Sequence, residues 1–234
     1  MNMTGKNCIV TGAASGIGKA IADHFADRAE IRHWGSGSAD ADLARRDGAA
    51  TLWQTALDRL DGRIDVVINN AGVFEAQPLD DDDDAWLDGW ERTLAINLTA
   101  AAQLCRFAVR HWQARGSGGR IVNIASRAAH RGDSPAHWHY AASKGGMVAM
   151  TKTIARGYAG EGILAFAISP GFTMTGMADD YLASRGGAEL LKDIPLGRVA
   201  APDEIARIAA FCATEAPPSM TGAVIDANGA SYVR

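Results

Sequence analysis

Short apolar segments alternate with amphipathic segments along almost the whole chain, and this alternation restricts the possible folds more than any other feature of the sequence. Apolar segments predict strands, and segments with apolar residues three and four apart predict helices. Such alternation favours a parallel sheet with helices on both faces. We therefore predict one α/β domain over residues 1–234, built on a doubly wound sheet. Strands are expected at residues 7–11, 30–34, 64–69, 120–125, 164–169 and 223–226, and helices at 16–28, 50–60, 85–115, 139–158 and 202–214.

A glycine-rich turn joins the first predicted strand to the first predicted helix, with the sequence Thr11-Gly12-Ala13-Ala14-Ser15-Gly16-Ile17-Gly18. Glycines permit a tight turn and a close backbone approach, and a helix N-terminus offers free N–H groups and a partial positive charge. The turn therefore predicts a site for the pyrophosphate of a dinucleotide. Its Gly-x-x-x-Gly-x-Gly spacing alone would also suit an ordinary loop.

Tyr140 and Lys144 lie four residues apart in a predicted helix. This spacing places a phenol and an ammonium on one face of the helix. A nearby cation favours the ionised phenol, so we expect Lys144 to lower the pKa of Tyr140 toward the range where a general base is useful. Taken alone, the pair is also typical of a solvated helix surface.

Together, these residues resemble the short-chain dehydrogenase/reductase family, and the resemblance covers nearly the whole chain. The family's motifs are matched by Thr11-Gly12-x-x-x-Gly16-x-Gly18, by Asn69-Asn70-Ala71-Gly72, by the tetrad Asn97, Ser126, Tyr140 and Lys144, by Pro170-Gly171 with Thr175, and by C-terminal elements around Gly197-Arg198 and Thr221-Gly222. The resemblance implies a Rossmann-type domain, which binds ligands beyond the carboxyl ends of its strands. Gly12, Asn70, Ser126 and Pro170 are all expected at that edge.

The resemblance also implies an oxidoreductase that transfers a hydride between NAD(P)(H) and a secondary alcohol or ketone. Removing a hydride from an alcohol carbon requires a base at its oxygen, and Tyr140 is the candidate acid/base. Lys144 is expected to hold the Tyr140 pKa down and to bond the nicotinamide ribose, Ser126 to hold the substrate oxygen, and Asn97 to hold a water beside the lysine. A 3-oxoacyl thioester, a hydroxy acid and a sugar derivative all remain open as substrates. A catalytically silent dinucleotide-binding sensor is the alternative.

Further site residues follow from the same resemblance. Residues 126–140 should line the substrate pocket, and their cations favour an acidic or polyhydroxylated substrate, although these side chains could equally face solvent or another subunit. The expected substrate contacts are Ser126, Arg127, Trp138 and Tyr140. The expected coenzyme contacts are Thr11, Gly12, Ser15, Gly16, Ile17, Gly18, Ser36, Asp42, Asn70, Ala71, Gly72, Tyr140, Lys144, Pro170, Gly171, Thr173 and Thr175.

The sequence departs from the family pattern in three places. Residues 30–62 are too few for the usual elements, so we expect residues 39–43 to form the next strand, Asp42 to lie beside the adenine, and the helix between strands 2 and 3 to be missing or vestigial. No carboxylate ends the second strand, where one would bond the ribose of NAD; Ser36 or Ser38 could bond a 2′-phosphate, so NADP is favoured over NAD. Phe166 replaces a usual asparagine, which predicts altered packing rather than altered chemistry.

Composition excludes several other classes of protein. The formal charge of −4 disfavours a nucleic-acid partner, and no apolar run reaches the about 18 residues of a membrane span, so a cytoplasmic protein is expected. Cys8, Cys105 and Cys212 are odd in number and lie in apolar segments, which predicts buried free thiols and no metal site. The acidic run 80–84 favours a solvated helix start over a cation site. The two longest predicted helices resemble those that build family dimers and tetramers, so a homodimer or homotetramer is expected.

Overall fold

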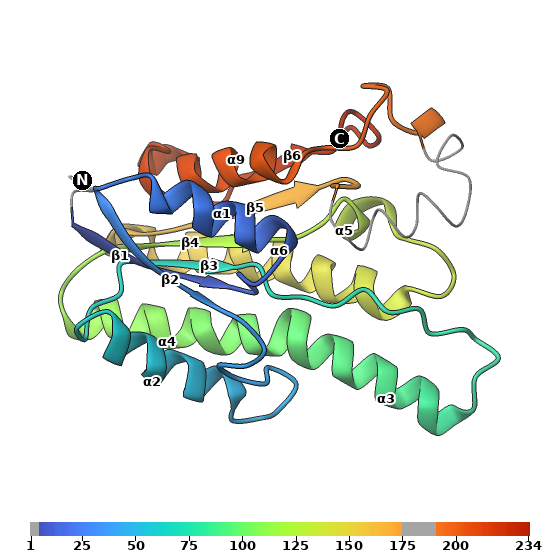
Figure 1. Cartoon of the computed structure of the whole chain (residues 1–234), viewed down its shortest axis with the longest axis horizontal. Coiled ribbons are helices and arrows are strands. Elements are labelled where there is room, and N and C mark those ends of the chain that lie inside the picture. Colours follow the sequence, from blue (N-terminus) through green and yellow to red (C-terminus); the bar gives the residue numbers. More distant parts are fainter. Residues whose placement is uncertain (1–4, 175–190) are drawn as a thin grey trace.

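The chain folds around one parallel sheet with helices on both faces (Figure 1). The computed structural model describes residues 5–174 and 191–234. The order in the six-stranded sheet is β2-β1-β3-β4-β5-β6, and every neighbouring pair is parallel. The strands are β1 (Lys6–Thr11), β2 (Ile31–Ser36), β3 (Val66–Asn69), β4 (Gly119–Ile124), β5 (Ile163–Pro170) and β6 (Val224–Ala227).

Alternate residues of the strands point to two apolar layers. Cys8 and Val10 of β1 pack in the layer that also holds Ile21, Phe25 and the alanines of the last helix. Ile9 packs in the opposite layer, under the helices that carry Leu52 and Leu104. The helices are α1 (Gly16–Ala26), α2 (Gly48–Arg59), α3 (Asp83–Leu94), α4 (Ala100–Ala114), α5 (Ala128–Arg131), α6 (Trp138–Tyr158) and α9 (Pro202–Thr214). Figure 1 shows α1 and α9 on one side of the sheet and α2 and α4 on the other.

These elements confirm the predicted α/β class, and the strand predictions other than residues 39–43 agree with the structure to within about two residues. Residues 37–47 form turns, so the expectation of a strand at residues 39–43 is wrong. These residues contain no helix either. The cause is local: Asp40 Oδ2 accepts a hydrogen bond from Gly37 N at 2.7 Å, and Asp42 Oδ1 accepts one from Ala44 N at 2.9 Å. Carboxylates that bond their own backbone favour turns over strands. The sheet therefore ends at β2.

The long helix expected at residues 85–115 is divided. A five-residue π-helix, Ala95–Thr99, separates α3 from α4 and contains Asn97. The acidic run opens α3 as expected, because Asp82 caps it by accepting a hydrogen bond from Ala85 N at 2.9 Å. Single π-turns within helices are frequently found at functional sites.

Other expectations concern single residues and the membrane. Cys8, Cys105 and Cys212 are buried free thiols, as predicted. Phe166 is fully buried in the layer beneath α9, and the Arg120 guanidinium lies 6.0 Å from its ring centre. Within residues 5–174 and 191–234, the helices are all too short or too polar to cross a membrane.

Candidate active site

The structure brings the predicted residues together at the carboxyl edge of the sheet. Thr11 ends β1, Asn70 follows β3, Ser126 follows β4 and Pro170 ends β5. Hydrogen bonds connect neighbouring segments at this edge: Asn70 Nδ2 donates to Thr11 O at 3.0 Å, and Arg127 N donates to Pro170 O at 2.9 Å. The site is therefore built from four strand ends that are far apart in the sequence.

The glycine turn has a shape that only glycine permits at its key positions. Gly12 and Gly16 have φ angles of 66° and 55°, in the left-handed region. A Cβ at Gly18 would overlap the Gly12 carbonyl oxygen and the Asn70 side chain. Thr11 Oγ1 connects this turn to the segment after β3, because it accepts hydrogen bonds from Asn70 N at 3.0 Å and Ala71 N at 2.9 Å.

This turn fits the pyrophosphate of a nicotinamide dinucleotide. It opens α1, an eleven-residue helix whose N-cap, Ser15, makes no side-chain capping bond, so the first N–H groups of the helix are not used by that side chain. Such groups, with the helix dipole, attract an anion. The residues that would hold the pyrophosphate are those from Gly12 to Gly18, and the bound coenzyme would supply or accept the hydride.

Lys144 and Tyr140 lie on one face of α6, with the Lys144 Nζ 5.7 Å from the centre of the Tyr140 ring. Lys144 is only 4% exposed, and its Nζ donates a hydrogen bond to Ile124 O at 2.8 Å. Its ammonium is thereby fixed between the sheet and the phenol. A helix of 21 residues, Trp138–Tyr158, sets this spacing.

The expected effect of the cation on Tyr140 is not found in the coenzyme-free chain. Burial raises the pKa of Tyr140 to about 12, a hydrogen bond with Ser126 opposes this rise, and the charge of Asp133 adds to it. Burial also lowers the pKa of Lys144 to about 8. Removal from water therefore dominates at both groups, and the prediction that Lys144 holds the Tyr140 pKa down is wrong for this state.

Asn97 reaches the same site from the π-helix. Its Oδ1 accepts a hydrogen bond from Val73 N at 2.8 Å, and its Nδ2 donates to Val73 O at 3.0 Å and to Ser143 Oγ at 3.3 Å. A Cβ at Gly72 would lie 3.2 Å from Asn97 Oδ1 and 3.5 Å from Lys144 Nζ. Gly72 thus lets the chain after β3 pass close to both polar groups.

Phe74, an aromatic residue that the sequence did not single out, lies against Tyr140. The edge of Phe74 meets the Tyr140 ring at 4.7 Å, and Phe74 stacks on His137 at 3.9 Å between ring centres. Phe74 comes two residues after Gly72, and this closeness to the Asn-Asn-Ala-Gly motif is the sequence feature that could have indicated its place in the site. By contrast, Trp138, an expected substrate contact, is 53% exposed and meets the edge of Trp86 at 6.4 Å.

The remaining expected coenzyme residues lie at either end of the site. Ser36 is buried at the end of β2, and its carbonyl accepts a hydrogen bond from Ala13 N at 2.8 Å. Asp42 lies in the turns beyond it. Gly171 N donates to Ala227 O at 3.0 Å, and Thr173 Oγ1 donates to Gly171 O at 3.3 Å. Thr175, also expected here, lies outside the described residues.

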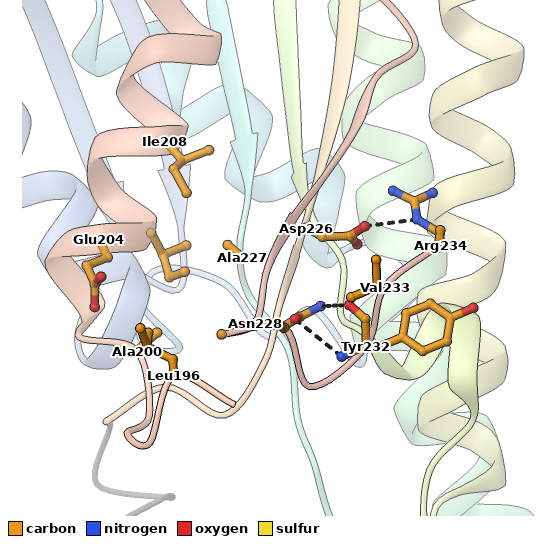
Figure 2. Close-up of a pocket in the computed structure, with 13 residues that line it drawn as sticks. Leu196, Ala200, Glu204, Ile208, Asp226, Ala227, Asn228, Tyr232, Val233 and Arg234 are labelled. Atoms are coloured by element: carbon orange, nitrogen blue, oxygen red, sulfur yellow. Dashed lines mark hydrogen bonds and ion pairs between the residues drawn. The ribbon is translucent and has the colours of Figure 1, made fainter. Parts of the chain in front are cut away.

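A pocket of about 390 Å³ lies between α9, β6 and the last residues of the chain (Figure 2). Asn228 closes a loop by bonding Tyr232, and Arg234 Nε pairs with Asp226 Oδ2 at 3.0 Å, as Figure 2 shows. The lining of this pocket includes none of the residues expected for catalysis or coenzyme binding. We therefore place the chemistry at the carboxyl edge of the sheet and not in this pocket.

Comparison with known proteins agrees with this geometry. A family model described as enoyl-(acyl carrier protein) reductase matches residues 29–229. A D-threitol dehydrogenase of Mycolicibacterium smegmatis is 35% identical over 99% of this chain and 95% of its own, and a cis-4-hydroxycyclohexanecarboxylate dehydrogenase of Sinomonas cyclohexanicum is 34% identical over 94% of each. The structure of a protein described as an NAD(P)-dependent gluconate 5-dehydrogenase of Beutenbergia cavernae, with NADP bound at low occupancy, is 33% identical, covers 97% of each chain and superposes with a TM-score of 0.87. The chain therefore belongs to the short-chain dehydrogenase/reductase family and is an NAD(P)-dependent oxidoreductase that acts on CH–OH groups.

Proposed function

We propose that this enzyme interconverts a secondary alcohol and a ketone with NADP(H), and that Tyr140 is its general acid/base. The observation that carries the proposal is the grouping of Tyr140, Lys144, Ser126 and Asn97 at the sheet edge that also holds the glycine turn. Polyols, hydroxy acids and sugar acids, which the names of the relatives include, are the candidate substrates, with 3-oxoacyl thioesters as a further class.

The proposed mechanism assigns one task to each side chain. Tyr140 takes the hydroxyl proton during oxidation and returns it during reduction, because its phenol is the titratable group beside Ser126. Ser126 donates a hydrogen bond to the substrate oxygen and fixes its position. Burial outweighs the effect of Lys144 in the coenzyme-free chain, but its Nζ, 5.7 Å from the ring centre, would stabilise the negative charge that develops on the phenol as the proton leaves. Asn97 holds the backbone beside Lys144, and a water there would carry the proton onward.

We propose NADP as the preferred coenzyme. Residues 36–38 offer no side-chain carboxylate for the ribose hydroxyls of NAD. The nearest acid beyond them, Asp40, is already bonded to Gly37 N at 2.7 Å. The gluconate dehydrogenase-like structure, which was crystallised with NADP, supports the same preference.

A panel of ketones and secondary alcohols, assayed separately with NADPH and NADH, tests both proposals. The panel should contain polyols, sugar acids, other hydroxy acids and 3-oxoacyl thioesters. We expect turnover of at least one class and a higher kcat/KM with NADPH than with NADH. Coenzyme binding without turnover of any compound would instead favour a silent dinucleotide-binding protein.

We further propose a cytoplasmic homodimer or homotetramer. Apolar side chains are exposed near the start of α3 and α6: Leu79 is 56% exposed, Leu87 49% and Trp138 53%, and Trp86 stacks on Trp90 at 5.4 Å. Light scattering should give two or four times the chain mass of 24.6 kDa. Leu87→Lys should shift the mass downward if this surface is the contact, and a single-chain mass for the parent protein would contradict the proposal.

A further inference from the structure

Arg127 occupies an unusual position, directly after Ser126 and beside the loop that follows β5. Its backbone N donates to Pro170 O at 2.9 Å, and its guanidinium lies 4.6 Å from the centre of the Phe172 ring. Stacking on an aromatic face fixes the plane of a guanidinium. Arg127 therefore presents an oriented cation between the predicted substrate-oxygen site and the loop expected to hold the nicotinamide.

One nitrogen of this guanidinium, Nη1, has no acceptor among the residues that the structure describes. This nitrogen is buried, and the ion pairs found in residues 5–174 and 191–234 do not include Arg127. Other arginines of the chain are satisfied: Arg63 pairs with Asp65, and Arg198 pairs with Glu204. Because a buried donor without a partner costs about 1–3 kcal/mol, such a group commonly awaits a ligand or a bound water.

Arg127 directly follows Ser126, whose side chain is hydrogen-bonded to Tyr140. The charge of Asp133 raises the pKa of Tyr140 and also acts on Arg127, so both groups lie within electrostatic range of one carboxylate. Asp193 also acts on the Arg127 charge, but neither carboxylate forms an ion pair with Arg127 among the described residues, and Asp133 Oδ1 accepts a hydrogen bond from Ser134 N at 2.8 Å. An anionic group of the substrate could therefore reach Arg127 while its reacting oxygen reaches Tyr140.

We propose that Arg127 binds a carboxylate of the substrate, so that the enzyme acts on hydroxy acids and oxo acids in preference to neutral alcohols. A planar guanidinium matches a carboxylate with two parallel hydrogen bonds, and an amide or hydroxyl cannot supply the opposite charge. The inference rests on the proposed function, because it places the reacting carbon beside Ser126 and Tyr140.

Matched pairs of acid and amide test the role of Arg127. D-gluconate is compared with D-gluconamide, and cis-4-hydroxycyclohexanecarboxylate with its carboxamide. Calorimetry measures the binding of each to the enzyme loaded with NADP⁺, and KM and kcat are measured for each compound that is oxidised. The parent enzyme should prefer an acid to its amide by about 10- to 100-fold, the range of a charge-assisted hydrogen bond.

Two variants separate charge from packing. Arg127→Gln and Arg127→Met both remove the cation, and methionine keeps an apolar chain against Phe172. In both, the acid-to-amide ratio should fall to about one, mostly through weaker binding of the acid. Arg59→Gln is the control, because Arg59 is exposed at the C-terminal end of α2, away from the carboxyl edge of the sheet, and it should keep the parent ratio.

Each outcome has a definite meaning. A parent enzyme with equal affinity for acid and amide, or with no affinity for either, overturns the role of Arg127, and so does a preference that survives Arg127→Met. Turnover of neutral alcohols without acid preference overturns this role alone and leaves the proposed oxidoreductase intact. If the enzyme binds the acid more tightly than the amide but oxidises neither, the proposed function is overturned and the carboxylate-binding role of Arg127 is supported. Thermal melts by circular dichroism show whether each variant folds, and if one of the two does not, the other carries the test. Arg127→Lys, which keeps the charge, should retain a preference for the acid.

Discussion

Replacing Tyr140 with phenylalanine should lower kcat by a factor of about 10² to 10⁴ while leaving coenzyme affinity within about threefold of the parent value. The variant removes the only group proposed to exchange a proton with the substrate oxygen. The ring itself stays, so its edge contact with Phe74 at 4.7 Å and the burial of Lys144 are preserved. Steady-state rates on the best substrate of the panel and a fluorescence titration with NADPH measure the two effects.

Tyr158→Phe is the matched control for that experiment. Tyr158 ends the same helix, α6, and is partly buried in the apolar layer around α4, so its replacement removes a phenol of the same helix away from the site. The control should keep the parent rate. Equal rates for Tyr140→Phe and the parent enzyme would show that the base lies elsewhere.

Gly18→Ala should destroy coenzyme binding and destabilise the fold. The added Cβ would overlap the Gly12 carbonyl oxygen and Asn70 Nδ2, two groups that are themselves hydrogen-bonded at 3.2 Å. The turn must open to admit the methyl group, which costs about 1–3 kcal/mol of stability. Because the same turn is proposed to hold the pyrophosphate, we expect the NADPH Kd to rise by at least about 100-fold, a loss of about 3 kcal/mol.

Gly157→Ala separates this effect from a general intolerance of alanine. Gly157 also lies in a helix, α6, and a Cβ there would meet no atom within 4 Å apart from the neighbouring backbone of its own helix. This variant should bind NADPH like the parent and be more stable by about 0.5–1 kcal/mol. Denaturant unfolding and NADPH titration of both variants check the pair. Parent-like NADPH affinity in Gly18→Ala would mean that the coenzyme does not use this turn.

The sequence predicted those parts of the molecule that depend on a repeated pattern. Alternating apolar and amphipathic segments located the sheet and its helices, and the spacing of Tyr140 and Lys144 placed both on one face of α6. The turns at residues 37–47 could not be predicted from such a pattern, because they depend on which backbone N–H groups the Asp40 and Asp42 carboxylates bond. The π-helix around Asn97 likewise has no repeating signal in the sequence.

The pKa of Tyr140 shows why charge could not be judged from spacing. Spacing reveals that a cation lies one turn away, which favours the phenolate. It does not reveal that both groups are removed from water, and burial raises the pKa of Tyr140 to about 12. Arg127 poses the same difficulty, because its position is set by Pro170 and Phe172, which are distant in the sequence.

The early end of the sheet at β2 affects how one molecule behaves toward another. A strand at the rim of a sheet presents backbone N–H and C=O groups that can pair with a rim strand of a second chain, a common route to aggregation. Arg32, near the start of β2, is exposed and binds Asp61 and the Arg59 carbonyl, which places charge along this rim. Because the sheet ends at β2, this edge strand could pair with another chain, and the ion-paired Arg32 places charge on it that opposes such pairing.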